Sequence, residues 1–240
     1  MPDSTKKQIR ELEIDAVSYS KIGYHTKAES TIKKALELKP RSNHLNHELA
    51  KIYLRSKQYE KALEILLKLS NKTKNRDILF KDIGLSYFGM GKLEKALEAS
   101  DVSLSEKQDY VEALILKGKS LRELERYDEA LVVLDKALSK DSKHRDALYQ
   151  KGKVLYIMGE NREALDLFNE VLDFRPRDTE VLAAKGLTHD ELGEFKDASD
   201  SLNRSLSVED EVVYNDRGVA LARLGYNHKA IDSYRRALAS

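Results

Sequence analysis

The feature that most constrains this chain is a pair of small-residue columns that recur at a fixed spacing. Glycine or alanine fills the first column, and alanine alone fills the second, which follows twelve residues later. Successive members are 34 residues apart, except for a last step of 32 residues. The first column is Ala16, Ala50, Gly84, Gly118, Gly152, Gly186 and Gly218, and the second is Ala28, Ala62, Ala96, Ala130, Ala164, Ala198 and Ala230. A period of this length indicates a solenoid built from one repeated unit.

One unit, residues 111–144, shows what repeats. Apolar or small residues fall at helical spacing from Leu114 to Leu124 and again from Ala130 to Leu138, with a polar pair between the two stripes. Two short helices with a tight connection form an antiparallel hairpin. The small residues at positions 8 and 20 of the unit let the two helix axes approach at the low end of the usual range of about 8–10 Å.

Composition excludes several classes of protein. Hydrophobic residues make up 41% of the chain and charged residues 35%, which suits thin helices with one solvent-exposed face. The absence of cysteine excludes disulfides and thiolate metal ligands. A net charge of +1 gives no global attraction to DNA or to a membrane surface. Since the sequence also lacks an apolar run of about 20 residues and a signal-peptide pattern, we expect a cytoplasmic protein without a membrane partner.

Further columns carry a family resemblance. Position 11 holds tyrosine or leucine in every unit except at His189, and position 15 holds glycine in every unit except at Lys57 and Glu125. Pro40 and Pro176 occupy position 32. With the two small-residue columns, this pattern resembles the tetratricopeptide repeat. The resemblance implies an all-α fold, a right-handed superhelical α-solenoid of helix hairpins whose first helices line a concave groove.

The periodicity also predicts how the chain is divided. We expect a polar N-terminal arm over residues 1–8, followed by a single solenoid of seven repeats. The predicted repeats are 9–42, 43–76, 77–110, 111–144, 145–178, 179–210 and 211–240.

The first helix of each unit has a second face that packing within the unit does not require. Positions 2, 5, 9, 12 and 13 share this face, so their composition can report on a ligand. In units 2 to 5 the face combines cations with aromatic rings. The candidate groove residues are Lys51, Arg55, Lys81, Phe88, Lys119, Arg122, Tyr149, Lys153 and Tyr156. We expect them to bind a protein or peptide with acidic and apolar side chains, because aromatic groups anchor such partners and charges orient them.

Other interpretations stay open. Any solvated helix surface favours lysine and glutamate, so the same residues are also consistent with a face that binds nothing. The main functional hypothesis is a non-catalytic protein–protein interaction scaffold, and the alternative is a regulatory or assembly domain of a larger enzyme complex. Nucleic-acid binding through the basic N-terminal repeats is a third hypothesis, against which the near-zero net charge and the acidic sixth repeat argue.

We expect no catalytic residue, no metal site and no cofactor. His44 and His47 lie three residues apart beside Glu48, but a stable metal site needs three or four ligands, so we interpret both as solvent-exposed histidines. No glycine-rich phosphate-binding motif occurs. At position 7, lysines are expected to cover the hairpin seam with their alkyl stems while the charge reaches water; they are Lys117, Lys151 and Lys185.

The last repeat is not followed by a polar capping helix, which solenoids normally need. We therefore expect Leu224, Ile231, Tyr234 and Leu238 to leave part of an apolar face exposed. Two explanations stay open: the protein continues beyond this repeat, or the face associates with a second copy of the chain.

Overall fold

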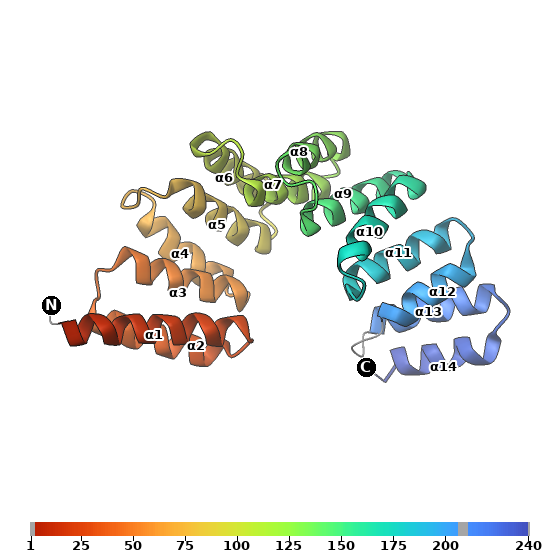
Figure 1. The fold of residues 1–240 in the computed structure, drawn as a ribbon, viewed down its shortest axis with the longest axis horizontal. Helices are drawn as coiled ribbons and strands as arrows, with labels where there is room; N and C mark the ends of the chain where they lie inside the picture. The colour runs from red at the N-terminus through yellow and green to blue at the C-terminus, as the bar shows by residue number, and fades with distance from the viewer. Residues whose placement is uncertain (1–2, 206–210, 240) are drawn as a thin grey trace. The chain divides into compact units, whose positions relative to one another are not determined.

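The computed structural model describes residues 3–205 and 211–239, and within these ranges the chain forms helices and no strands (Figure 1). The helices are α1 Asp3–Lys21, α2 His25–Leu38, α3 Asn43–Arg55, α4 Tyr59–Leu69, α5 Arg76–Gly89, α6 Leu93–Glu106, α7 Val111–Glu123, α8 Tyr127–Lys140, α9 Arg145–Met158, α10 Asn161–Phe174, α11 Thr179–Glu191, α12 Phe195–Ser205, α13 Glu211–Arg223 and α14 Asn227–Ala237. The all-α class predicted from the sequence is confirmed.

Within the described residues, hairpins form between α1 and α2, α3 and α4, α5 and α6, α9 and α10, α11 and α12, and α13 and α14. In every repeat the odd-numbered helix is called helix A and the even-numbered helix is called helix B. From α3 onward, helices A begin at the first residue of a predicted repeat, or one residue earlier in the case of α5. The N-terminus differs from expectation, because residues 3–8 are helical rather than a separate arm. An ion pair one turn apart, from Lys6 Nζ to Asp3 Oδ1 at 2.9 Å, and the buried Ile9 explain why the helix extends this far.

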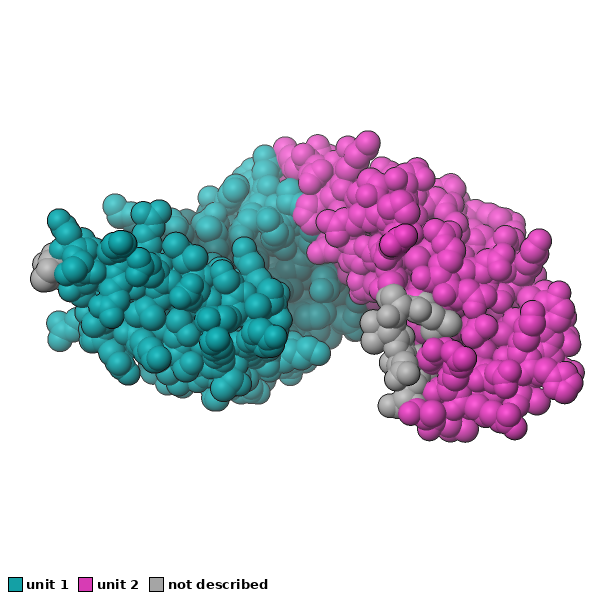
Figure 2. All heavy atoms as spheres, turned by 60° about the horizontal axis from the view of Figure 1, so that its bottom comes forward, with its two compact units in different colours: residues 1–125 teal, residues 126–240 magenta. Residues whose placement is uncertain are grey.

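The chain divides into two compact units, residues 1–125 and residues 126–240 (Figure 2). In the first, consecutive helices pack on one another from α1 to α7, and helices A also contact in the order α1, α3, α5, α7. In the second, packing runs from α8 to α14, and α11 contacts both α9 and α13. Helices A therefore form a continuous layer within each unit. The predicted single solenoid over residues 9–240 stays a prediction.

The small-residue columns lie where helices A and B press together. A Cβ atom added at Gly152 would lie 2.5 Å from Cε1 of Phe168, and one added at Gly218 would lie 2.5 Å from Cε1 of Tyr234. Real Cβ atoms do not tolerate such distances, so bulk on helix B requires glycine on helix A. The predicted close approach is confirmed at these crossings.

The turn between helices A and B requires a left-handed backbone residue at position 15. Gly159 has a φ of 84° there, which glycine adopts at no steric cost. Lys57 and Glu125, the two exceptions in the sequence column, keep the same conformation with φ values of 58° and 60°. The turn is therefore imposed by the packing of the hairpin, and not by glycine alone.

The position-7 lysines bridge consecutive repeats. Lys117 Nζ lies 2.6 Å from Asp101 Oδ1, and Lys151 Nζ lies 2.5 Å from Asp135 Oδ1. Lys185 Nζ donates to Asn169 Oδ1 at 2.7 Å in the same way. Each charge lies at the exposed surface, as expected, and in addition meets an acceptor on helix B of the preceding repeat, which periodicity did not predict.

None of the described helices combines the length and the apolar character that crossing a membrane requires.

Candidate functional site

The six candidate residues of the first unit all lie on the layer of helices A. Lys51 and Arg55 belong to α3, Lys81 and Phe88 to α5, and Lys119 and Arg122 to α7. They differ in what they present to a partner, since Arg55 is exposed, Arg122 is buried and the other four are half-buried.

Carboxylates hold two of these cations in place. Lys51 Nζ lies 2.6 Å from Oε1 of Glu48 on the same helix, and Lys81 pairs with the neighbouring Asp82. Arg55 instead donates to Ser20 Oγ at 3.4 Å, a long contact between α3 and α1. The cations of this face are thus partly neutralised within the unit.

The two histidines of α3 are part of the same network. His44 Nε2 lies 2.6 Å from Oε1 of Glu13 on α1, and His47 Nε2 lies 2.7 Å from Oδ2 of Asp82 on α5. The side chain of His44 is 65% exposed, but that of His47 is only 19% exposed. The interpretation of both as solvent-exposed residues is therefore wrong for His47, which packs between repeats.

Asp82 is the most deeply buried charge of this network, at 1% exposure. Burial by itself would raise the pKa of its carboxyl group, but the hydrogen bond with His47 and the charge of Lys81 outweigh burial and lower the pKa below its ordinary value. The carboxylate stays ionised and joins α3 to α5.

Aromatic contacts complete the first-unit face. Lys119 Nζ lies 5.2 Å from the ring centroid of Phe88, within the range of a cation–π interaction between α7 and α5. Arg122, although a candidate, pairs with Glu123 and is buried. Phe88 and Lys119 are therefore better placed than Arg122 to meet a partner.

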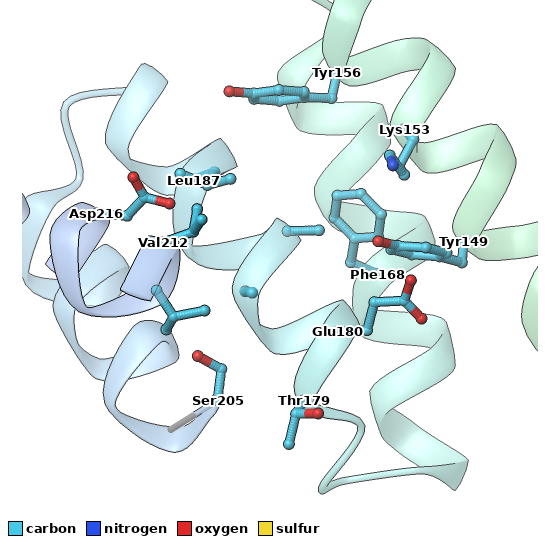
Figure 3. Close-up of a pocket in the computed structure, with 13 residues that line it drawn as sticks. Tyr149, Lys153, Tyr156, Phe168, Thr179, Glu180, Leu187, Ser205, Val212 and Asp216 are labelled. Carbon is cyan, nitrogen blue, oxygen red and sulfur yellow. The ribbon is translucent and has the colours of Figure 1, made fainter. Parts of the chain in front are cut away.

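The three candidates of the second unit come together at a cavity of about 460 Å³ (Figure 3). Its wall is built mainly by helices A, with contributions from α10 and the end of α12. The lining residues are Tyr149, Lys153, Tyr156, Phe168, Thr179, Glu180, Ala183, Ala184, Leu187, Ser205, Val212, Val213 and Asp216. Figure 3 shows the α9 side chains on one side and those of α13 on the other, with α11 between them.

Two aromatic rings form an apolar part of this wall. Tyr149 and Phe168 are buried, and their ring centroids are 6.1 Å apart with the planes tilted by 48°. Two cations lie against the Tyr149 ring: Lys153 Nζ at 5.6 Å and the guanidinium carbon of Arg145 at 4.8 Å from its centroid. Aliphatic side chains of α11 and α13 supply the rest of the apolar surface.

The cavity wall carries charges of both signs. Lys153 is the cation among the described lining residues, whereas Glu180 and Asp216 are carboxylates. Burial raises the pKa of Tyr156, and the charges of Glu191, Asp190 and Asp216 raise it further. The Tyr156 hydroxyl therefore faces an acidic environment.

An arginine clamp fixes α9 against α11, and thus fixes the cavity. Arg145 donates from Nε and Nη2 to the two carboxylate oxygens of Asp178, at 2.8 and 2.7 Å, and from Nη2 to Glu180 Oε2 at 2.6 Å. Asp178 also caps α11 by accepting from the Val181 backbone N–H at 3.2 Å. The hydrogen bonds with Asp178 raise the pKa of Arg145, and they lower the pKa of Asp178.

Sequence analysis missed several members of this site. Phe168 sits at position 24 of its repeat and is a core residue by periodicity, although its ring also reaches the cavity wall. Arg145 and Asp178 are the first and last residues of a repeat, where periodicity carries no signal. Leu187 and Val212 occupy positions 9 and 2 of later repeats, so they share the predicted face although they are not among the candidate residues.

The last hairpin exposes apolar side chains, as predicted. Leu238 is 88% exposed and Ile231 is also exposed, while Leu224 and Tyr234 are half-buried. Self-association through this repeat stays a prediction.

Comparison with known proteins decides the family. A family model described as tetratricopeptide repeat matches residues 23–82 and 121–188, and a second model with the same description matches residues 212–240. The chain belongs to the tetratricopeptide repeat family. No curated protein matches the sequence.

Solved structures share this tetratricopeptide repeat fold. A tetratricopeptide repeat protein from Parabacteroides merdae is 23% identical with a TM-score of 0.71, and the match covers 97% of this chain and 93% of that one. PilW, a type IV pilus biogenesis factor, is 19% identical with a TM-score of 0.76 over 83% of this chain and 94% of its own. MamA from Desulfovibrio magneticus RS-1 is 22% identical with a TM-score of 0.61, over 69% and 94%. Such low identities show a common fold and no more.

Proposed function

We propose that this tetratricopeptide repeat protein is an interaction scaffold that binds a segment of a partner protein on the helix A layer of its second unit. Tetratricopeptide repeats are generally protein–protein interaction scaffolds rather than catalysts. The cavity of about 460 Å³ is the observation that carries the proposal. Its volume lies within the range of about 300–1,000 Å³ typical of ligand sites, and its wall is mainly apolar with a few polar groups.

The chemistry of the wall defines the segment that would fit. A large apolar side chain of the partner would pack against Tyr149, Leu187 and Val212, with the buried Phe168 supporting the Tyr149 ring from behind. An acidic group of the partner would face Lys153, in keeping with the expected acidic and apolar partner. Asp216 favours a basic or neutral group at the opposite end of the same segment.

The contacts of the first unit support a protein partner over a nucleic acid. A surface that binds phosphates presents many cations that lack internal partners, since affinity comes from neutralising the backbone. Lys51 and Lys81 are instead paired with Glu48 and Asp82.

The cavity can be tested by filling it. Ala183 is half-buried on α11 and lines the cavity, so Ala183→Phe places a ring in the space meant for the partner. Peptides would be selected from a random library on the natural chain, and their dissociation constants measured by fluorescence polarisation. We expect selected peptides to share a large apolar residue and to bind Ala183→Phe at least about tenfold more weakly, a difference of about 1.4 kcal/mol.

The matched control adds the same ring elsewhere in the second unit. Val132 is exposed on α8 and does not line the cavity, so Val132→Phe should leave peptide affinity unchanged. The proposal fails if the library yields no binders, or if the selected peptides bind Ala183→Phe as tightly as the natural chain.

A further inference from the structure

The turn between helices A and B of the sixth repeat brings three metal-ligating side chains together. One ligand atom from each of His189, Glu194 and Asp197 lies within 4.8 Å of the other two. His189 belongs to α11 and Asp197 to α12, and Glu194 directly precedes α12. None of the three lines the cavity of the second unit, so this cluster is independent of the proposed peptide site.

The backbone that holds these residues is already organised. The Glu194 N–H donates to the His189 carbonyl at 2.9 Å, and Gly193 between them has a φ of 75°. The corresponding bond recurs in other repeats, for example from the Tyr24 N–H to the Tyr19 carbonyl at 2.9 Å. Positions 11, 16 and 19 of a repeat are therefore held by a turn that does not depend on the side chains placed there.

The sixth repeat combines an imidazole with two carboxylates at these positions. In the first three repeats, position 11 is tyrosine and position 19 is lysine, and the ammonium lies over the ring, as Lys27 does at 4.2 Å from the Tyr19 centroid. In the fourth and fifth repeats position 11 is leucine and position 19 is glutamate. The sixth repeat places His189 at position 11, beside Glu194 at position 16 and Asp197 at position 19. The imidazole is therefore what distinguishes the sixth repeat from the fifth, which has two carboxylates beside a leucine at these positions.

These three side chains suit a metal ion because of their donor atoms and because solvent reaches them. Imidazole nitrogen and carboxylate oxygen are ordinary ligands of zinc and related divalent ions. The side chains of His189 and Glu194 are 13% and 27% exposed and Asp197 is exposed, so an ion can enter from solvent.

The geometry requires only side-chain movement. His189 Nδ1 lies 2.7 Å from Glu194 Oε2, whereas ligands about 2.0–2.2 Å from a tetrahedral ion are about 3.3–3.6 Å apart. An ion would separate this pair slightly and draw Asp197 inward. Arg162 Nη2 donates to the other Glu194 oxygen at 2.6 Å, and such an outer contact orients a ligating carboxylate.

We propose that His189, Glu194 and Asp197 bind a divalent transition-metal ion of the zinc class, with water completing the coordination. Bound in this turn, the ion joins α11 to α12. This inference departs from the expectation of no metal site, because periodicity does not show which residues the turn brings together.

Calorimetric titration of the whole chain with ZnCl₂ tests the site directly, and the visible absorption of Co²⁺ reports its coordination. We expect saturable binding of one ion per chain. His189→Gln removes the nitrogen ligand, and the double variant His189→Tyr with Asp197→Lys restores the residues of the first three repeats. Both should weaken binding by more than the roughly 10–100-fold that loss of an outer contact typically causes.

His44 provides the matched control, because it forms a similar pair with Glu13 at 2.6 Å. His44→Gln should leave zinc affinity unchanged. Circular dichroism and thermal melting in EDTA check that each variant folds. If His189→Gln does not fold, the double variant still tests the site. The proposal is rejected if no saturable binding occurs, if the His189 variants bind normally, or if His44→Gln loses affinity to the same extent.

Discussion

At the scale of single residues, position 15 shows how the scaffold overrides local preference. Lys57 holds a φ of 58° where five other repeats have glycine. The left-handed conformation costs a residue with a Cβ roughly 1–2 kcal/mol. Lys57 retains the conformation because its turn is bonded on both sides, by its own N–H to Leu54 and by the Gln58 N–H to Tyr53.

Lys57→Gly should therefore stabilise the chain. Glycine removes the left-handed strain but adds freedom to the unfolded chain, so we expect a net gain of up to about 1 kcal/mol in the free energy of unfolding. Urea denaturation followed by circular dichroism measures it. The same change at Lys34, exposed within α2, should cost about 1 kcal/mol, and a loss at both positions would contradict the argument.

The small residues at positions 8 and 20 could be predicted from the sequence, because the same contact between helices A and B recurs in each hairpin. Ala16 and Gly152 are buried where the pattern requires small residues. Charged contacts could not be predicted in this way. The pair between His47 and Asp82 depends on which side chains adjacent helices happen to bring opposite each other, and each repeat places different residues there.

At the scale of helices, the Arg145–Asp178 clamp decides how α9 and α11 face the cavity. The 3.6-residue period predicts the helices and the turns between them. It does not predict the clamp, because Arg145 and Asp178 lie at the ends of two different helices. The cavity itself was predictable only in part. Tyr149, Lys153 and Tyr156 share a face by spacing, whereas the depth of the cavity depends on packing around Phe168.

The clamp should make stability fall in acid. The folded-state pKa of Asp178 is lowered, so its stabilising contribution is fully present above the unfolded-state value of about 3.9 and is lost as pH falls through the lower folded value. Asp178→Asn should cost about 1–3 kcal/mol at neutral pH and reduce the acid-dependent loss. Urea denaturation across this pH range measures both effects.

Asp173, exposed on α10, supplies the control for removing one negative charge. Asp173→Asn should leave both the neutral-pH stability and its acid dependence nearly unchanged. If Asp178→Asn behaved like this control, the clamp would contribute nothing to the folded state.

At the scale of the whole molecule, contacts run between neighbouring helices, so damage should stay local. Gly152→Ala places a methyl group 2.5 Å from the Phe168 ring and should cost about 1–3 kcal/mol. Hydrogen exchange read by mass spectrometry should show lost protection in α8 to α11 and normal protection in α1 to α3.

Adding Phe168→Leu to Gly152→Ala reproduces the pairing of Ala50 with Leu66 in the second repeat and should restore much of the protection. An equal loss of protection along all described helices would instead mean that the array unfolds as one cooperative body.

The lysine bridges have a consequence for how such a chain can lengthen. Residues 145–178 contain a donor for the bridge to the preceding repeat, Lys151 in α9, and an acceptor for the bridge from the following repeat, Asn169 in α10. An in-frame duplication of this segment would place the Lys151 of the second copy opposite the Asn169 of the first copy. The added hairpin would therefore form a lysine bridge to its neighbour without any further substitution. Growth by whole segments thus needs no compensating change elsewhere in the gene.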